Sequence, residues 1–87
     1  MADLLTGKRG LIMGVANDRS IAWGIARAMR AEGADLAFSY QGDAFGKRVR
    51  PLAESLGSDL LLDVDVTDDA SLDAAFAEIA ERWGRLD

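Results

Sequence analysis

The chain has 87 residues, of which 49% are hydrophobic and 29% are charged, so it can form one small domain with a modest core. Fifteen acidic against ten basic residues give a net charge of −5, which argues against binding to nucleic acid or to an anionic membrane. The lack of cysteine and histidine excludes disulfides, a thiol nucleophile, a Cys/His metal site and a Ser-His-Asp triad. No apolar run is long enough to span a membrane and no signal peptide is recognisable, so we expect a cytoplasmic protein.

The N-terminal part of the chain predicts a strand followed by a helix. Residues 11–13 form a short apolar run that ends at Gly14, as in a strand buried on both faces. Ser20 can cap a helix over residues 20–32, with Gly33 in the left-handed stop position. Five residues at helical spacing predict the buried face of this helix: Ile21, Ala22, Ile25, Ala26 and Met29.

The same alternation continues through the middle of the chain. Residues 36–40 predict a second strand, and residues 44–56 have the composition of a second helix. Pro51 lies inside that helix, so we expect a kink or a break near Arg50.

The C-terminal part predicts a third strand and a third helix. Residues 60–66 form the strand, and Thr67 or Asp68 can cap a helix that ends at Gly84. Residues 85–87 resemble the approach to a fourth strand.

Strands that alternate with helices predict an α/β, Rossmann-like doubly wound fold with a parallel sheet. The elements would form its N-terminal βαβαβα half, with strands in the order 3-2-1. Strand 1 would then lie at an edge, although it is as apolar as a central strand. We therefore interpret residues 1–87 as the N-terminal part of a single dinucleotide-binding domain, truncated before strand 4.

Ligands of open α/β sheets bind at the carboxyl ends of the strands. Gly14 would let a ligand approach the backbone closely there, and Ser20 and Ile21 would present backbone N–H groups at a helix N-terminus, which suits a pyrophosphate. The same residues are also typical of a tight turn before a capped helix. Because Gly-x-Gly-x-x-Gly and a Walker loop are both absent, the motif alone leaves both interpretations open.

Residues 7–26 closely resemble the N-terminus of bacterial enoyl-[acyl-carrier-protein] reductases, which are divergent short-chain dehydrogenases/reductases. That family has the fingerprint Gly-x5-Ser-x-Ala, found here as Gly14, Ser20 and Ala22. The resemblance continues through residues 36–42, 47–49, 65–68 and 83–87. It spans essentially the whole chain and about the first third of such an enzyme.

The resemblance implies NAD as cofactor. It implies that Gly14 lies under the pyrophosphate and that Ser20 with Ile21 holds it. No catalytic residue and no metal ligand is assigned to this chain.

On the adenosine side, the resemblance implies that Gln41 lies near the ribose, that Asp65 accepts a hydrogen bond from the adenine amino group, and that Val66 packs against the ring. Asp63 receives no role and is interpreted as solvated. Two tryptophans are interpreted as core or interface residues: Trp23 and Trp83.

The family's activity would be the NADH-dependent reduction of 2-enoyl thioesters on acyl-carrier protein, in fatty acid biosynthesis, by a homotetramer. The family's catalytic Tyr-x6-Lys spacing also occurs here, from Tyr40 to Lys47. We interpret this pair as coincidence, because it starts at the end of the second strand and contains Gly42 and Gly46.

Three alternatives remain. A ketoacyl reductase would carry Thr-Gly-x3-Gly-x-Gly, which residues 13–16 do not match. A phospho-acceptor receiver domain would need an acidic pair after the first strand to hold Mg²⁺, where this chain has Met13 and Gly14. A non-catalytic nucleotide-binding module is the third.

Overall fold

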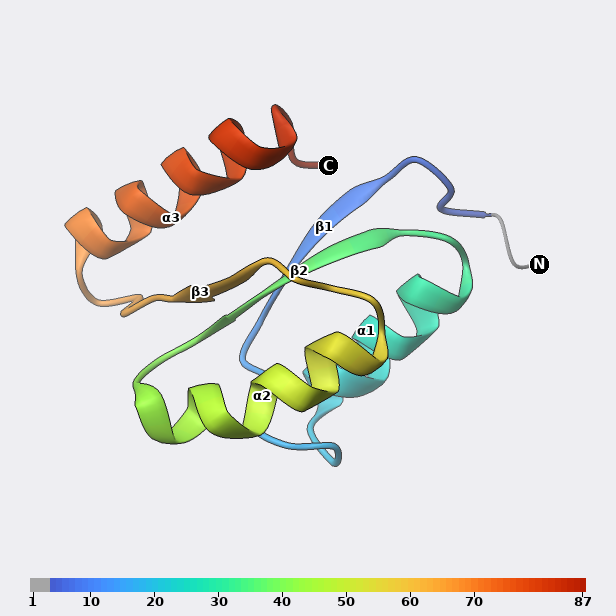
Figure 1. Cartoon of the computed structure of the whole chain (residues 1–87), viewed down its shortest axis with the longest axis horizontal. Helices are drawn as coiled ribbons and strands as arrows, with labels where there is room; N and C mark the ends of the chain where they lie inside the picture. Colours follow the sequence, from blue (N-terminus) through green and yellow to red (C-terminus); the bar gives the residue numbers. More distant parts are fainter. Residues whose placement is uncertain (1–3) are drawn as a thin grey trace.

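The computed structural model describes residues 4–87, in which three strands alternate with three helices (Figure 1). The elements in chain order are β1 (Arg9–Met13), α1 (Ile21–Ala31), β2 (Asp35–Tyr40), α2 (Asp43–Ser55), β3 (Leu61–Asp63) and α3 (Asp69–Trp83). The strands pair in parallel in the order β1-β2-β3, so β2 is central. The predicted α/β class, parallel sheet and strand order are confirmed.

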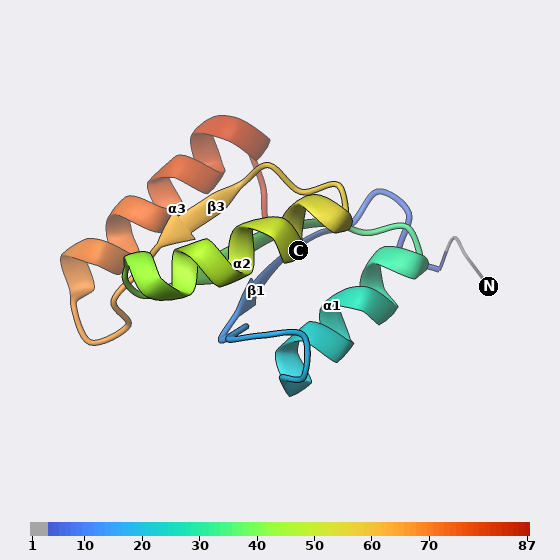
Figure 2. The ribbon, with the colours of Figure 1, turned by 60° about the horizontal axis from the view of Figure 1, so that its bottom comes forward.

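The sheet has a helix layer on each face, with α1 and α2 on one side and α3 on the other (Figures 1 and 2). Successive residues of β2 point to opposite faces, so Leu36 and Phe38 join the core under α1 and α2, while Ala37 joins the core under α3. Trp23 packs against Phe38 with ring centroids 6.4 Å apart. Its predicted place in the core is confirmed.

The capping signals of α1 are confirmed, but its predicted buried face is partly wrong. Ser20 is the N-cap, and Gly33 has a φ of +99°. Ile21 and Ile25 are 84% and 51% exposed, whereas the core takes Trp23 and Ala26. Trp23 has the largest apolar side chain of the helix, so its burial turns the packed face towards it and leaves the two isoleucines outside.

Helix α2 runs through Pro51 without a break, so the predicted split near Arg50 is wrong. Proline cannot donate to the carbonyl one turn earlier, which weakens the helix locally. Val49 and Ala53, on either side of Pro51, are nevertheless almost completely buried against the sheet. Their burial stabilises the helix on both sides of Pro51.

Strand β3 is shorter than the predicted strand over residues 60–66. Sheet pairing extends one residue beyond each end, since the Phe38 N–H donates to the Leu60 carbonyl (3.0 Å) and the Val64 N–H to the Tyr40 carbonyl (2.7 Å). At Asp65 the backbone N–H turns away to the Ser71 hydroxyl at 2.9 Å. The chain therefore leaves the sheet before Val66.

Helix α3 begins and ends where the sequence indicates. The Asp68 carboxylate accepts from the Ala70 N–H at 3.0 Å, which makes Asp68 rather than Thr67 the N-cap. Gly84 ends the helix with a φ of +78°. No helix within residues 4–87 has the length and hydrophobicity needed to cross a bilayer.

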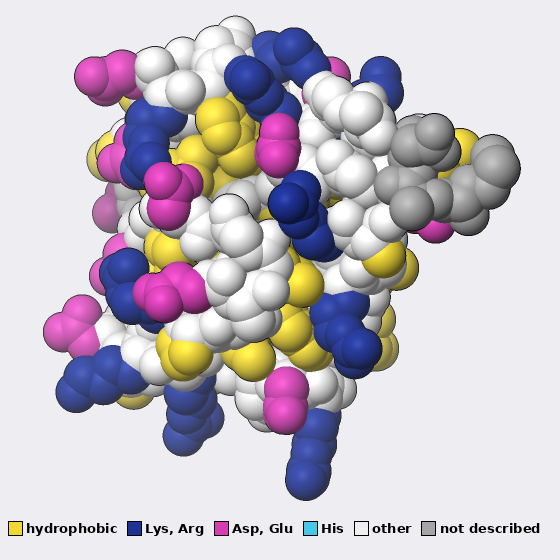
Figure 3. All heavy atoms as spheres, turned by 45° about the vertical axis from the view of Figure 1, so that its right-hand side comes forward, with side chains coloured by type: hydrophobic (Ala, Val, Ile, Leu, Met, Phe, Trp, Pro, Cys, Tyr) yellow, Lys and Arg dark blue, Asp and Glu magenta, His cyan; other side chains and the backbone are white. Residues whose placement is uncertain are grey.

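The surface carries both signs of charge. On the face shown in Figure 3, Lys and Arg side chains alternate with Asp and Glu, and small hydrophobic patches lie between them. Neither sign forms a continuous patch on that face.

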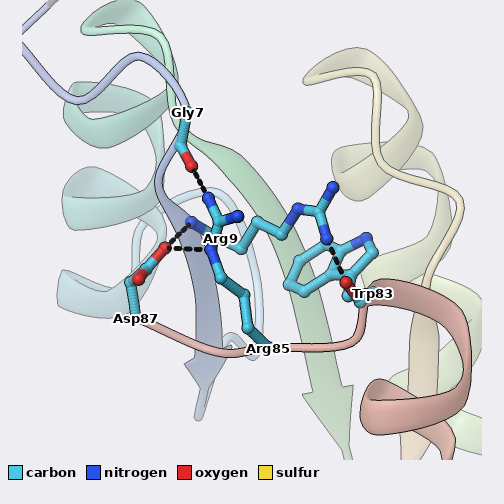
Figure 4. Close-up of polar contacts among 5 residues, drawn as sticks. All are labelled: Gly7, Arg9, Trp83, Arg85 and Asp87. Atoms are coloured by element: carbon cyan, nitrogen blue, oxygen red, sulfur yellow. Dashed lines mark hydrogen bonds and ion pairs between the residues drawn. The ribbon is translucent and has the colours of Figure 1, made fainter.

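Polar contacts join the end of α3 to the start of β1 (Figure 4). The Arg9 guanidinium donates to the Trp83 carbonyl and lies over the Trp83 ring, 5.9 Å from its centroid. The Arg9 N–H donates to Asp87 Oδ2 (2.9 Å), and the Asp87 N–H donates to the Arg9 carbonyl (2.8 Å). Residues 85–87 thereby occupy the start of the free edge of β1, at the position expected for the approach to a fourth strand.

We expect Arg9→Ala to lower the free energy of unfolding of the chain by about 1–2 kcal/mol. The variant removes the hydrogen bond to the Trp83 carbonyl and the cation–π contact with the Trp83 ring. Lys8→Ala is the matched control: Lys8 is exposed and adjacent, and its loss should change stability by less than about 0.5 kcal/mol. Urea unfolding measures both. Equal midpoints for the two variants would contradict the stabilising role of Arg9.

Candidate cofactor site

A hollow of about 250 Å³ opens at the carboxyl ends of β1 and β2. We call it the first hollow. Carboxyl ends of strands are where open α/β sheets bind ligands. Its volume is below that of pockets that enclose a whole ligand, about 300–1,000 Å³, so it suits one part of a dinucleotide. Its walls are mainly apolar and include Gly14, Ala16, Gln41, Phe45 and Val66.

The turn after β1 leaves its backbone accessible. Gly14 has a φ of +88°, and a Cβ placed there would meet nothing within 4 Å. Asn17 braces the following loop: its side-chain oxygen accepts from the Arg19 N–H (2.8 Å), and its carbonyl accepts from the Ser20 hydroxyl (2.9 Å). Asn17 has no predicted role, although an asparagine that bonds to the backbone two residues later is a common turn-former.

Ser20 and Ile21 lie at the N-terminus of α1 and do not line the first hollow. The Ser20 hydroxyl accepts from the Trp23 N–H at 3.4 Å, so it acts as a helix cap. Because the first N–H groups of a helix have no acceptor within it, what Ile21 can offer a ligand is its backbone N–H.

The turn after β3 carries Asp65 and Val66. Val66 lines the first hollow and is 58% exposed, whereas Asp65 does not line it. Asp65 Oδ1 accepts from both the hydroxyl (2.6 Å) and the backbone N–H (2.9 Å) of Thr67. These bonds, the hydroxyl first, lower the pKa of Asp65 below its usual value. Within residues 4–87 they leave Oδ2 without a protein donor, so the carboxylate is oriented and ionised with one oxygen available.

The turn after β2 is held by a residue that sequence reasoning left without a role. Asp63, at the end of β3, accepts from the Gly42 N–H through Oδ1 at 3.0 Å. The interpretation of Asp63 as merely solvated is therefore wrong. Gln41, one residue before Gly42, is exposed and lines the first hollow. No sequence motif marks Asp63, because its contact partner Gly42 lies 21 residues away and the register of β2 with β3 brings the two together.

Tyr40 and Lys47 both line a second hollow, beside α2. Tyr40 ends β2 and Lys47 lies on α2, so they belong to different elements rather than to one helix. Tyr40 also borders the first hollow.

A model of the family described as "Enoyl-(Acyl carrier protein) reductase" matches residues 14–87. The chain belongs to this family. It is 62% identical over 87 residues to "Enoyl-[acyl-carrier-protein] reductase [NADH] 2" of Rhizobium meliloti, covering 100% of this chain and 32% of that protein. It is 53% identical over 83 residues to "Enoyl-[acyl-carrier-protein] reductase [NADH] FabI" of Escherichia coli, covering 95% and 32%. The predicted family is confirmed.

Solved enoyl-[acyl-carrier-protein] reductases share this fold. FabI from Candidatus Liberibacter asiaticus aligns with a TM-score of 0.97 and 56% identity, over 100% of this chain and 34% of that one. The enzyme from Anaplasma phagocytophilum, solved in complex with NAD, aligns with a TM-score of 0.95 and 53% identity, over 100% and 33%. The chain thus spans about a third of the length of these relatives.

We expect Thr67→Val to raise the pKa of Asp65 towards 3.8, because the variant removes the hydroxyl donor and keeps the backbone donor. A lowered pKa in the folded state stabilises the protein above the usual pKa, and this contribution is lost as the pH falls through the folded value. Carboxyl-detected NMR titration measures the pKa of Asp65 in the variant and in the unmodified chain. The Asp87 pKa, lowered mainly by the Arg9 N–H, is the internal control and should not move. An unchanged Asp65 pKa would contradict the role of the hydroxyl.

Proposed function

We propose that this chain is the cofactor-binding segment of an NADH-dependent enoyl-[acyl-carrier-protein] reductase. The enzyme would reduce 2-enoyl thioesters on acyl-carrier protein in fatty acid biosynthesis. The observation that carries the proposal is the open, positive-φ backbone of Gly14 beside the first hollow, in a chain of this family. The Rhizobium meliloti and Escherichia coli relatives are NADH enzymes by name, and the Anaplasma phagocytophilum enzyme was solved with NAD.

The phosphate side of the cofactor would lie between the first hollow and α1. Gly14 would lie under the pyrophosphate, since the space next to its Cα is open. Ser20 would hold the helix N-terminus in place as its cap, and Ile21 would donate its backbone N–H. Among the residues that the structure describes, none that lines the first hollow is basic. Backbone N–H groups would therefore make most of the contacts with the pyrophosphate.

The adenosine side would occupy the first hollow. Val66 would pack against the adenine ring, and Gln41 would contact the ribose. Asp65 would accept from the adenine amino group through Oδ2, because Oδ1 already has two donors. These residues would offer the adenosine half of NAD a mainly apolar wall and one available carboxylate oxygen.

When bound, the nicotinamide supplies a hydride. We assign no catalytic residue to this chain, and the Tyr40–Lys47 pair stays a coincidence of spacing in this proposal. The whole enzyme would be a cytoplasmic homotetramer. A ketoacyl reductase and a non-catalytic nucleotide-binding module are the competing assignments, and neither would support NADH-dependent turnover of an enoyl thioester.

A chimeric reductase tests the proposal. In it, this chain replaces the 83 matching residues of the Escherichia coli relative. We expect NADH-dependent reduction of an enoyl thioester, and we expect Gly14→Ala to raise KM for NADH by about tenfold or more, because the new methyl group lies where the pyrophosphate would approach.

Gly84→Ala is the matched control for Gly14→Ala. Gly84 also has a positive φ (+78°) and nothing within 4 Å, so both variants suffer similar backbone strain, about 1 kcal/mol. Only Gly14 borders the first hollow. Equal KM values for the two variants, or an inactive chimera, would contradict the proposal.

We also predict that the chimeric reductase prefers NADH to NADPH by about tenfold or more, equivalent to roughly 1.4 kcal/mol. A 2′-phosphate adds nearly two negative charges and normally pairs with a basic residue at the end of the second strand. Here Gln41, Gly42 and Asp43 follow β2. The ratio of kcat/KM for the two cofactors measures the preference.

Two basic residues of α2 provide the controls for this preference. Lys47 lines the second hollow, whereas Arg48 lies over Phe45, with 6.0 Å between its guanidinium and the ring centroid. Lys47→Ala and Arg48→Ala should leave the preference unchanged. Equal use of both cofactors, or an NADPH preference that either variant abolishes, would contradict the prediction.

A further inference from the structure

The ring of Tyr40 lies directly against the backbone of α2 at Gly46. A Cβ at position 46 would lie 2.7 Å from Tyr40 Cε2 and 3.1 Å from Cζ. Carbon atoms in contact normally stay about 3.5–4.0 Å apart, so the ring can occupy this place only if residue 46 has no side chain. The Tyr40 ring therefore packs against α2 at Gly46, and we call this contact the ring seat.

Gly24 shows that this requirement is specific to position 46. Both glycines lie inside helices, and neither has a positive φ. A Cβ at Gly24, however, would meet nothing within 4 Å. A glycine inside a helix is less favourable than alanine at the same position. At position 46 the packing of the Tyr40 ring explains why glycine is present in place of alanine.

The backbone around Tyr40 is held from the neighbouring strand. Tyr40 pairs with Asp63, and its carbonyl accepts from the Val64 N–H at 2.7 Å. Two residues later, the Gly42 N–H is held by the Asp63 carboxylate. Gln41 lies between these two anchors, and the Tyr40 ring packs against the backbone at Gly46. The ring seat is thus the third constraint on the turn that carries Gln41.

Tyr40 also separates the two hollows. It lines the first hollow together with Gln41 and Phe45, and the second together with Gly46 and Lys47. A ring displaced from Gly46 must move away from α2. Such a movement changes the wall of the first hollow and the direction in which the chain enters Gln41.

We propose that Tyr40 is a positioning residue for the adenosine half of the cofactor, with Gly46 as the seat that fixes its ring. The inference rests on the proposed function, and it adds a pair of residues to which neither the family fingerprint nor the sequence motifs give a binding role. Tyr40 acts through Gln41 and the shape of the first hollow.

The experiment compares Gly46→Ala with Gly24→Ala in the chimeric reductase. We expect Gly46→Ala to raise KM for NADH at least about fivefold and to leave kcat unchanged, while Gly24→Ala changes neither. Reduced nicotinamide mononucleotide lacks the adenosine half, so kcat/KM with this donor should be the same for both variants. A general loss of folding would lower kcat/KM with both donors.

If Gly46→Ala folds poorly, variants of Tyr40 test the same contact from the other side. Tyr40→Phe keeps the ring and should behave as the unmodified protein. Tyr40→Leu removes the ring and should raise KM for NADH as Gly46→Ala does. Because both changes destroy the same seat, the double variant should cost no more than the larger single effect. Full additivity, or a normal KM in Tyr40→Leu, overturns the inference.

The chain itself provides a readout that does not depend on activity. Tyr40 is its only tyrosine, so its ring resonances can be followed by NMR without ambiguity. They should shift in Gly46→Ala and stay in place in Gly24→Ala. Unchanged ring resonances in Gly46→Ala would contradict the packing of the Tyr40 ring against Gly46 and overturn the inference, even if the reductase is active. If the Tyr40 resonances shift in Gly46→Ala but the unmodified chimera does not use NADH, the proposed function is contradicted. The packing of the Tyr40 ring against Gly46 is then still supported.

Discussion

The central position of β2 is the constraint on which the rest of the structure depends. It pairs with β1 on one side and β3 on the other, and its alternate residues enter the cores of both helix layers. Ala37 and Phe38 have no exposed surface. A strand so enclosed has one register with each neighbour, since a slip of one residue would exchange its two faces. That register brings the ends of all three strands to the same edge of the sheet.

Polar contacts from other elements help to hold the turns after β2 and β3 at that edge. Asp63 at the end of β3 binds the turn after β2, and Ser71 of α3 binds Asp65 in the turn after β3. Each contact ties a cofactor-side residue to a different element. The turns after β2 and β3 therefore keep their arrangement only while these contacts hold, so the proposed adenosine side depends on several elements of the fold.

The sequence predicted the elements well and their contacts poorly. The caps Ser20 and Gly84 were recognisable because capping depends on local chemistry. The exposure of Ile21 and the continuity of α2 through Pro51 were not, because packing against the sheet decides both. Gly14 was predicted from its place at the end of the first strand, and Gln41 and Val66 through the family resemblance; all three line the first hollow. The roles of Asp63 and Gly46 depend on partners in other elements, so no local pattern could reveal them.

The charge of the chain explains the form that this site takes. A chain with a net charge of −5 repels a pyrophosphate at long range, and no residue that lines the first hollow, as described, is basic. In the proposed complex, attraction would then come from short-range dipoles, which are the N–H groups at the start of α1 and the open backbone at Gly14. Such donors act only where the backbone is held in one conformation. In the proposed site, the caps, turns and glycines of this chain would therefore contribute to binding through the backbone geometry that they fix, more than through the charge of any side chain.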